Sequence, residues 1–115
     1  MNVLLIGGGE IAQLLCEELH HNHTITVLEM NEQRLQAFEN YDVQALSGTG
    51  TDGDDLRRAG AGVADAVLSI TGNDDVNILS ALAAHGLGAK RTLALVSRNR
   101  YLHAFSRSGP LHEAG

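Results

Sequence analysis

The residues best suited to binding a charged ligand form a glycine-rich run near the amino terminus. The run is Gly7-Gly8-Gly9-Glu10-Ile11-Ala12, which fits the pattern G-x-G-x-x-G/A. In this pattern the first glycine permits a tight turn, the second lets the backbone approach a pyrophosphate, and the last small residue keeps the next helix close to the sheet. Free N–H groups at the start of that helix favour an anion. We therefore predict a phosphate-binding turn, the alternative being an ordinary glycine-rich turn between a strand and a helix.

An acidic residue follows the glycine run at the spacing of a ribose-binding carboxylate. Glu29 ends the second apolar run, 20 residues after Gly9. A carboxylate at this place accepts hydrogen bonds from the ribose hydroxyls of an adenosine, and its charge repels a 2′-phosphate. The spacing predicts NAD(H) or ATP, ADP or AMP as ligand and disfavours NADP. The alternative is a solvated carboxylate at the end of a strand.

Further candidates follow the later apolar runs. They are Gly48, Thr49 and Asp52, then Thr71, Gly72 and Asn73, and finally Arg98. Asp52 has the chemistry to accept from the adenine amine. N-capping of the next helix is compatible with that contact and, taken alone, is the favoured role, and Asn73 or Asp74 is likewise suited to cap the helix that follows it. Arg98 is suited to a phosphate or a nicotinamide-side contact, or to an ordinary place on the surface. Glu10 would lie near the ligand's phosphates and weaken binding unless it turns outward.

Other reactive side chains give weaker signals. His20, His21 and His23 lie at spacings that rarely converge on a metal without further ligands, so we expect a solvated helix end. Cys16 falls inside the first expected helix and is predicted to be an inert buried thiol. No nucleophile–base arrangement or paired-carboxylate site stands out, and we predict a binding domain with no catalytic residues.

Apolar runs alternate with helical patterns along the chain, and this alternation predicts the strands and helices that position the candidate residues. Strands are expected at 2–6, 24–28, 43–46, 66–70 and 92–96, and helices at 10–20, after Asn31, and at 54–59, 74–85 and 99–106. Ile11, Leu15 and Leu19 are expected to form one buried stripe. Asn31 is expected to cap a short helix that carries Leu35 and Phe38. The alternation predicts an α/β fold: a doubly wound, Rossmann-like parallel sheet in three layers with strand order 3-2-1-4-5. The candidate residues then meet at the carboxyl ends of the strands, beside the switch point between strands 1 and 4.

Composition and charge narrow the class of protein. The 115 residues are 43% hydrophobic and 19% charged with net charge −6, which suits one folded domain. Thirteen of the fourteen acidic residues lie in 1–89, so nucleic acid is not an expected partner. No apolar stretch approaches the roughly 20 residues that span a bilayer. A single cysteine is compatible with a reducing cytoplasm.

Residues 1–107 resemble the nucleotide-binding domain (RCK, KTN or TrkA-N) of the Trk potassium uptake protein A family, with a loose tail at 108–115. The resemblance rests on segments in order: 3–12; Ile25-Thr26-Val27-Leu28-Glu29-x-Asn31-x-x-Arg34; Gly48-Thr49-Gly50-Thr51-Asp52-x-x-x-Leu56-x-x-Ala59-Gly60; Thr71-x-Asn73-Asp74-Asp75-x-Asn77-Ile78. It implies that Gly7, Gly9, Glu29 and Asp52 carry the family's binding roles. Met30 and Arg34, beside the ribose acid, join the candidate cofactor-binding residues.

The resemblance also implies a function. Such a domain binds NAD(H), ATP, ADP or AMP and regulates cation flux through an integral-membrane potassium transporter subunit. It works as a homo-oligomer, on the cytoplasmic face of the membrane, through conformational change rather than chemistry. The family's sixth strand and small carboxyl-terminal domain are not evident after Ser106. Two alternatives are the cofactor domain of an NAD-dependent oxidoreductase and a methyltransferase domain.

Overall fold

The computed structural model describes residues 1–97, and the predictions made for Arg98, for a helix at 99–106 and for the tail lie outside them. The described elements are β1 (Asn2–Ile6), α1 (Glu10–Leu19), β2 (Thr24–Glu29), α2 (Glu32–Gln36), β3 (Gln44–Ser47), α3 (Gly53–Arg58), the 3₁₀ turn η1 (Ala61–Val63), β4 (Ala66–Ser69), α4 (Asp74–Leu87) and β5 (Thr92–Ala94). None of the helices formed by these residues has the length and apolar composition of a membrane span.

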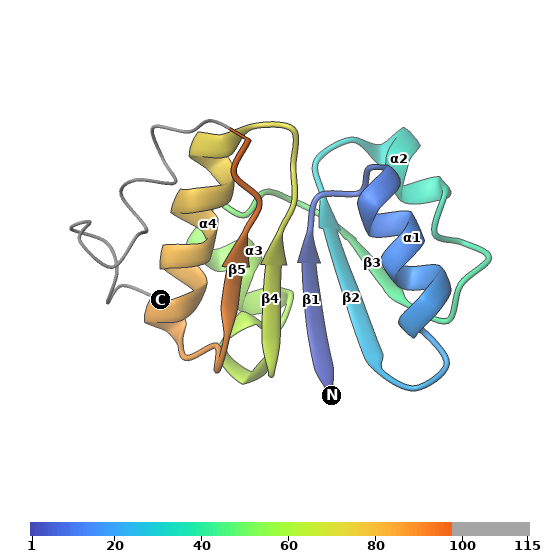
Figure 1. Cartoon of the computed structure of the whole chain (residues 1–115), viewed down its shortest axis with the longest axis horizontal. Helices are drawn as coiled ribbons and strands as arrows, with labels where there is room; N and C mark the ends of the chain where they lie inside the picture. The colour runs from blue at the N-terminus through green and yellow to red at the C-terminus, as the bar shows by residue number, and fades with distance from the viewer. Residues whose placement is uncertain (98–115) are drawn as a thin grey trace.

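The sheet has the predicted topology. Its five strands are parallel and run in the order β3-β2-β1-β4-β5, so the order reverses between β1 and β4 (Figure 1). All arrowheads in Figure 1 point to the same edge of the sheet. The loops that follow the strands therefore converge there, and the doubly wound α/β class is confirmed.

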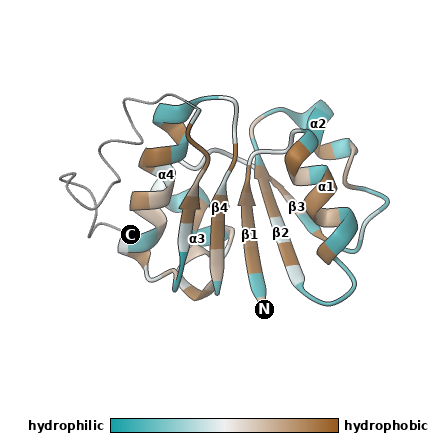
Figure 2. Ribbon diagram, in the orientation of Figure 1, coloured by the Kyte–Doolittle hydropathy of each residue, from teal (hydrophilic) through white to brown (hydrophobic). Residues whose placement is uncertain are grey.

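Alternation of side chains along β1 builds the two halves of the core. Val3 and Leu5 pack with residues of α1 and with Phe38, while Leu4 and Ile6 pack with residues of α3, η1 and α4. Consecutive strand residues point to opposite faces, so one buried strand supports both helical layers. The brown strands of Figure 2 show this apolar centre between more polar helix surfaces.

Helix α1 corrects one expectation. Ile11 is 46% exposed and does not belong to the buried stripe, which is formed by Ala12 and Cys16 with Leu15 and Leu19 packed against them. Only the expectation for Ile11 is wrong, because the helix approaches the sheet through its small residues Ala12 and Cys16. The buried Cys16 thiol is as predicted, and burial raises its pKa to about 11.

Capping residues fix where the helices begin. The side chains of Asn31, Asp52 and Asn73 each accept hydrogen bonds from backbone N–H groups in the first turn of the next helix. The caps predicted for these residues are confirmed. Phe38 lies beyond the end of α2, in a turn, yet is only 1% exposed. It packs against the glycine run, where a Cβ on Gly8 would come within 3.1 Å of its ring.

Candidate functional site

A groove of about 370 Å³ lies at the carboxyl edge of the sheet, between the loops that follow β1, β2, β3 and β4. Its lining residues are Ile6, Gly7, Leu28, Glu29, Met30, Arg34, Gly48, Thr49, Gly50, Thr71, Gly72, Asn73 and Val76. Nine of the predicted site residues are among them. The volume is within the usual range for a small-molecule site, about 300 to 1,000 Å³.

The glycine run makes the tight turn that its sequence predicts. Gly7 has a φ of +109°, and a side chain there would lie 3.1 Å from the backbone nitrogen of Thr71. Gly8 is also closely packed, because a Cβ there would come within 3.1 Å of the side chains of Phe38 and Glu29. Gly7 and Gly8 therefore allow the β1–α1 turn to pack against its neighbours.

Gly9 has a different role from the two glycines before it. A Cβ on Gly9 would meet nothing within 4 Å, and Gly9 caps α1 without a side-chain hydrogen bond. The first turn of this ten-residue helix therefore has no side-chain cap to accept from its N–H groups, and the space beside Gly9 is open. Glu10 and Ile11 are exposed. Of the predicted run only Gly7 lines the groove, and Gly8, Gly9, Glu10 and Ile11 lie outside its lining. This helix start can receive a phosphate, with the Glu10 carboxylate as a nearby negative charge.

Glu29 is the central acidic group of the groove. Its side chain is 9% exposed, its Oε1 accepts from the N–H of Gly8 at 2.7 Å, and its Oε2 accepts from the N–H of Asn31 at 2.9 Å. One carboxylate oxygen has two lone pairs, so each oxygen keeps one for a ligand hydroxyl. The carboxylate ties the glycine run to the end of β2 and presents its remaining acceptors to the groove.

Two residues after β2 complete this side of the groove. Nη1 of Arg34 lies 3.7 Å from Oε1 of Glu29, with the arginine side chain 59% exposed. Met30 is 69% exposed and presents an apolar surface. Charge compensation by Arg34 is weak because it is largely solvated. The combination suits a sugar beside an apolar base.

The loop after β3 forms the opposite wall. Gly48, Thr49 and Gly50 line the groove, whereas Asp52 does not. Oδ1 of Asp52 instead accepts from the N–H groups of Asp54 and Asp55 at 2.8 and 3.1 Å. The capping role is thus seen directly, and the contact of Asp52 with an adenine amine stays a prediction.

The loop after β4 is held by a buried asparagine. Asn77 is fully buried; its Oδ1 accepts from the N–H of Thr71 at 2.8 Å and from the Thr71 hydroxyl at 2.6 Å. Its Nδ2 donates to the carbonyls of Thr71 and Leu95 at 3.0 and 2.9 Å. Asp74, also buried, accepts from the N–H and hydroxyl of Ser97. The two side chains tie the ends of β4 and β5 together.

Sequence reasoning missed part of the site. Ile6, Leu28 and Val76 line the groove although their types suggested only core, and Asp55 and Asn77 position loops without lining it. A polar residue on the buried side of an apolar helix was the available signal for Asn77. No comparable signal marks Asp55, because the group that it positions is a backbone N–H of another segment.

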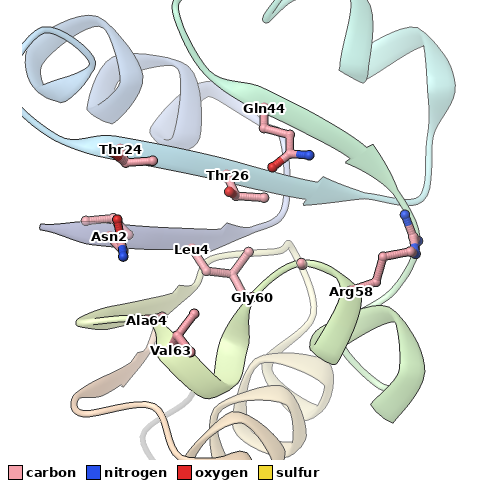
Figure 3. Close-up of a pocket in the computed structure, with 11 residues that line it drawn as sticks. Asn2, Leu4, Thr24, Thr26, Gln44, Arg58, Gly60, Val63 and Ala64 are labelled. Carbon is pink, nitrogen blue, oxygen red and sulfur yellow. The ribbon is translucent and has the colours of Figure 1, made fainter.

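Other surface features lie away from the groove. The rings of His20 and His21 are 3.9 Å apart at the end of α1, and no group of three metal-ligating side chains occurs within residues 1–97. A second hollow of about 230 Å³ lies on the sheet face beside α3, with Thr24, Thr26 and Gln44 along it (Figure 3). Its hydroxyl and amide groups come from strands rather than from the converging loops.

Comparison with known sequences places the chain in a family. The model of the TrkA-N domain family matches residues 3–112. The Trk system potassium uptake protein TrkA homolog of Archaeoglobus fulgidus is 36% identical over 102 residues, covering 89% of this chain and 23% of the relative. The chain thus spans about a quarter of the length of this relative.

Two solved structures share the fold. A Rossmann-fold NAD(P)-binding family protein from Shigella flexneri has a TM-score of 0.65 and 26% identity, covering 79% of this chain and 49% of that one. The GsuK channel bound to NAD has a TM-score of 0.66 and 20% identity, covering 90% of this chain and 22% of that one. At this identity the channel shows the fold alone.

Proposed function

The chain belongs to the TrkA-N domain family, and on this premise we propose that it is a regulatory domain that binds an adenine nucleotide in the groove. The ligand is NAD(H) or ATP, ADP or AMP. Occupancy of the groove controls potassium transport through an integral-membrane transporter subunit. The relative from Archaeoglobus fulgidus supports the transport system by its name, and the NAD-bound GsuK channel supports the ligand class.

The observation that carries the proposal is the placement of two complementary subsites on one turn. An uncapped helix start at Gly9 offers N–H groups to phosphates, and the Glu29 carboxylate, bonded to Gly8, offers acceptors to ribose hydroxyls. The backbone of a single residue separates them, so phosphate and ribose of one nucleotide reach both. A 2′-phosphate would meet the buried carboxylate, which disfavours NADP.

Regulation requires that the nucleotide bind one conformation of the assembly more tightly than another. We propose a homo-oligomer, docked to the transporter at the inner face of the membrane, whose two arrangements differ in the shape of the groove. The domain comprises residues 1–107, and it acts by binding rather than by catalysis. Arg98, which follows Ser97 in the sequence, is proposed to contact a ligand phosphate.

A thermal-shift panel with NADH, NADPH, ATP, AMP and S-adenosylmethionine tests the ligand class. A ligand at a hundredfold over its Kd should stabilise the chain by about 2.7 kcal/mol. NADH, ATP or AMP should raise the melting temperature, and NADPH should do so less than NADH. Stabilisation by S-adenosylmethionine alone would contradict the proposal and indicate a methyltransferase domain.

The same samples separate binding from catalysis. NADH oxidation on addition of a carbonyl substrate would support the oxidoreductase alternative. A matched Glu39→Gln variant, altered at an exposed acid that does not line the groove, should keep the ligand ranking of the unmodified chain. A ranking that changed in this control would show that the shifts do not report on the groove.

A further inference from the structure

Helix α3 carries two ion pairs of identical composition and spacing, and only one of them touches the wall of the groove. Asp54 pairs with Arg57 at 3.0 Å, and Asp55 pairs with Arg58 at 3.2 Å. The side chain of Asp54 is 95% exposed, whereas that of Asp55 is 26% exposed. The difference arises because Asp55 lies against segment 47–49, at the end of β3.

The Asp55–Arg58 pair contacts each residue of this segment. Oδ2 of Asp55 accepts from the N–H of Thr49 at 3.0 Å, and Nη2 of Arg58 donates to the carbonyl of Ser47 at 2.7 Å. Gly48 lies between them, and a Cβ there would come within 2.8 Å of the Asp55 carboxylate. Figure 3 shows Arg58 reaching from α3 to the end of β3. The carboxylate thus occupies the space that a side chain at position 48 would need.

This segment leads directly into the groove. Gly48 and Thr49 line it, and the N–H of Gly48 donates to the carbonyl of Glu29 at 3.1 Å. Asp55 and Arg58 do not line it. The wall that the pair holds lies beyond β2, on the far side of Glu29 from β1. A ligand whose ribose meets Glu29 extends its base along this wall.

We propose that the Asp55–Arg58 pair is a positioning device for the base end of the nucleotide: it holds segment 47–49 in the shape that receives the ligand, without touching the ligand. The inference rests on the proposed function for its ligand. Two charge-assisted hydrogen bonds and a close glycine contact fix one loop from the helix that follows it. The Asp54–Arg57 pair provides an internal control, since it lies on the same helix and makes no contact with the segment in the structure.

The test compares four single variants of the full chain: Asp55→Ala and Arg58→Ala against Asp54→Ala and Arg57→Ala. Affinities for NADH and for ATP are measured by calorimetry, and melting temperatures are recorded without nucleotide. We expect Asp55→Ala to weaken nucleotide binding about tenfold and Asp54→Ala less than about twofold. Asp55→Asn, which keeps one oxygen for Thr49, should lie between them. It also serves as the test variant if Asp55→Ala fails to fold.

Amide hydrogen exchange at Thr49 gives a second measurement that needs no nucleotide. Without its acceptor the Thr49 N–H should exchange faster in Asp55→Ala than in Asp54→Ala. Equal affinities in the Asp55 and Asp54 variants, or equal Thr49 exchange rates, would overturn the positioning role. If the unmodified chain binds none of NADH, ATP, ADP and AMP, the proposed function fails. The exchange rates then decide on their own whether the pair shapes the loop.

Discussion

Glu29 offers the sharpest test of the site because one carboxylate serves both the fold and the predicted ligand. It accepts the N–H of Gly8 at 2.7 Å and the N–H of Asn31 at 2.9 Å through different oxygens. Glu29→Gln keeps the size of the side chain and leaves one oxygen. Whichever way the new amide is oriented, one of the two N–H groups faces an NH₂ group and loses its acceptor.

The size of the effect follows from these contacts. A hydrogen bond to a charged group contributes about 1.5–3 kcal/mol, and the solvated Arg34 contact adds less than about 1 kcal/mol. We therefore expect Glu29→Gln to lower the free energy of unfolding by about 2 kcal/mol. In a domain of this size that corresponds to a fall of roughly 8 °C in Tm. Loss of an acceptor for the ribose should in addition weaken NADH binding about tenfold.

Two measurements on Glu29→Gln separate its roles. Differential scanning calorimetry without ligand reports the loss of the backbone contacts, and titration calorimetry with NADH and NADPH reports ribose recognition. The ratio of the NADPH and NADH dissociation constants should fall, because the variant removes the charge that repels a 2′-phosphate. Glu39→Gln, at an exposed position, is the matched control and should change neither quantity.

A Tm of Glu29→Gln within about 1 °C of the unmodified chain would refute the role of Glu29 in holding the glycine run. An unchanged NADPH-to-NADH ratio would refute its role in ribose selection, even if the fold were destabilised. Because the two results are independent, the structural and ligand roles can fail separately.

Three further predictions concern the turn, the helix start and acid stability. Gly7→Ala should lower the free energy of unfolding, measured by denaturant titration, by about 1–3 kcal/mol. The reason is that a residue with a Cβ is strained at the φ of +109° that Gly7 adopts. Glu10→Gln should tighten ATP binding measured by calorimetry while lowering the free energy of unfolding by less than about 1 kcal/mol, since the carboxylate favours the helix start but repels phosphates. Hydrogen bonds to Thr49 and Arg58 hold the pKa of Asp55 below its usual 3.8, and those to Asn2 and Lys90 do so for Asp65. A carboxyl group whose pKa is lowered by folding adds to the free energy of unfolding above pH 3.8, and this contribution is lost as the pH falls through the lowered pKa. An acid titration of the free energy of unfolding should show this loss. Asp65→Asn should make the loss smaller.

Much of the fold and part of the site were predictable because they depend on local patterns. Short aliphatic runs alternating with helical segments predict the parallel sheet and its order, and the glycine spacing predicts the turn at Gly7. Ile11 was misplaced because periodicity cannot tell whether large or small residues of a helix face the sheet. The contact of Asp55 with the loop was not predictable, because Asp55 lies within α3 and its partner, the N–H of Thr49, belongs to the segment before that helix.

By itself, the sequence determined the class of fold, the glycine turn, the acid at the end of β2 and the resemblance to a nucleotide-binding family. These features depend on residue type and on spacing along the chain, which local stereochemistry converts into strands, turns and helix starts. The tertiary structure alone decided which polar groups meet across the sheet edge. Glu29 bonds Gly8, Asn77 joins the ends of β4 and β5, and Asp55 holds the loop at Thr49. Contacts of this kind depend on how far each loop extends beyond its strand, and that distance is set only when the helices pack on the sheet.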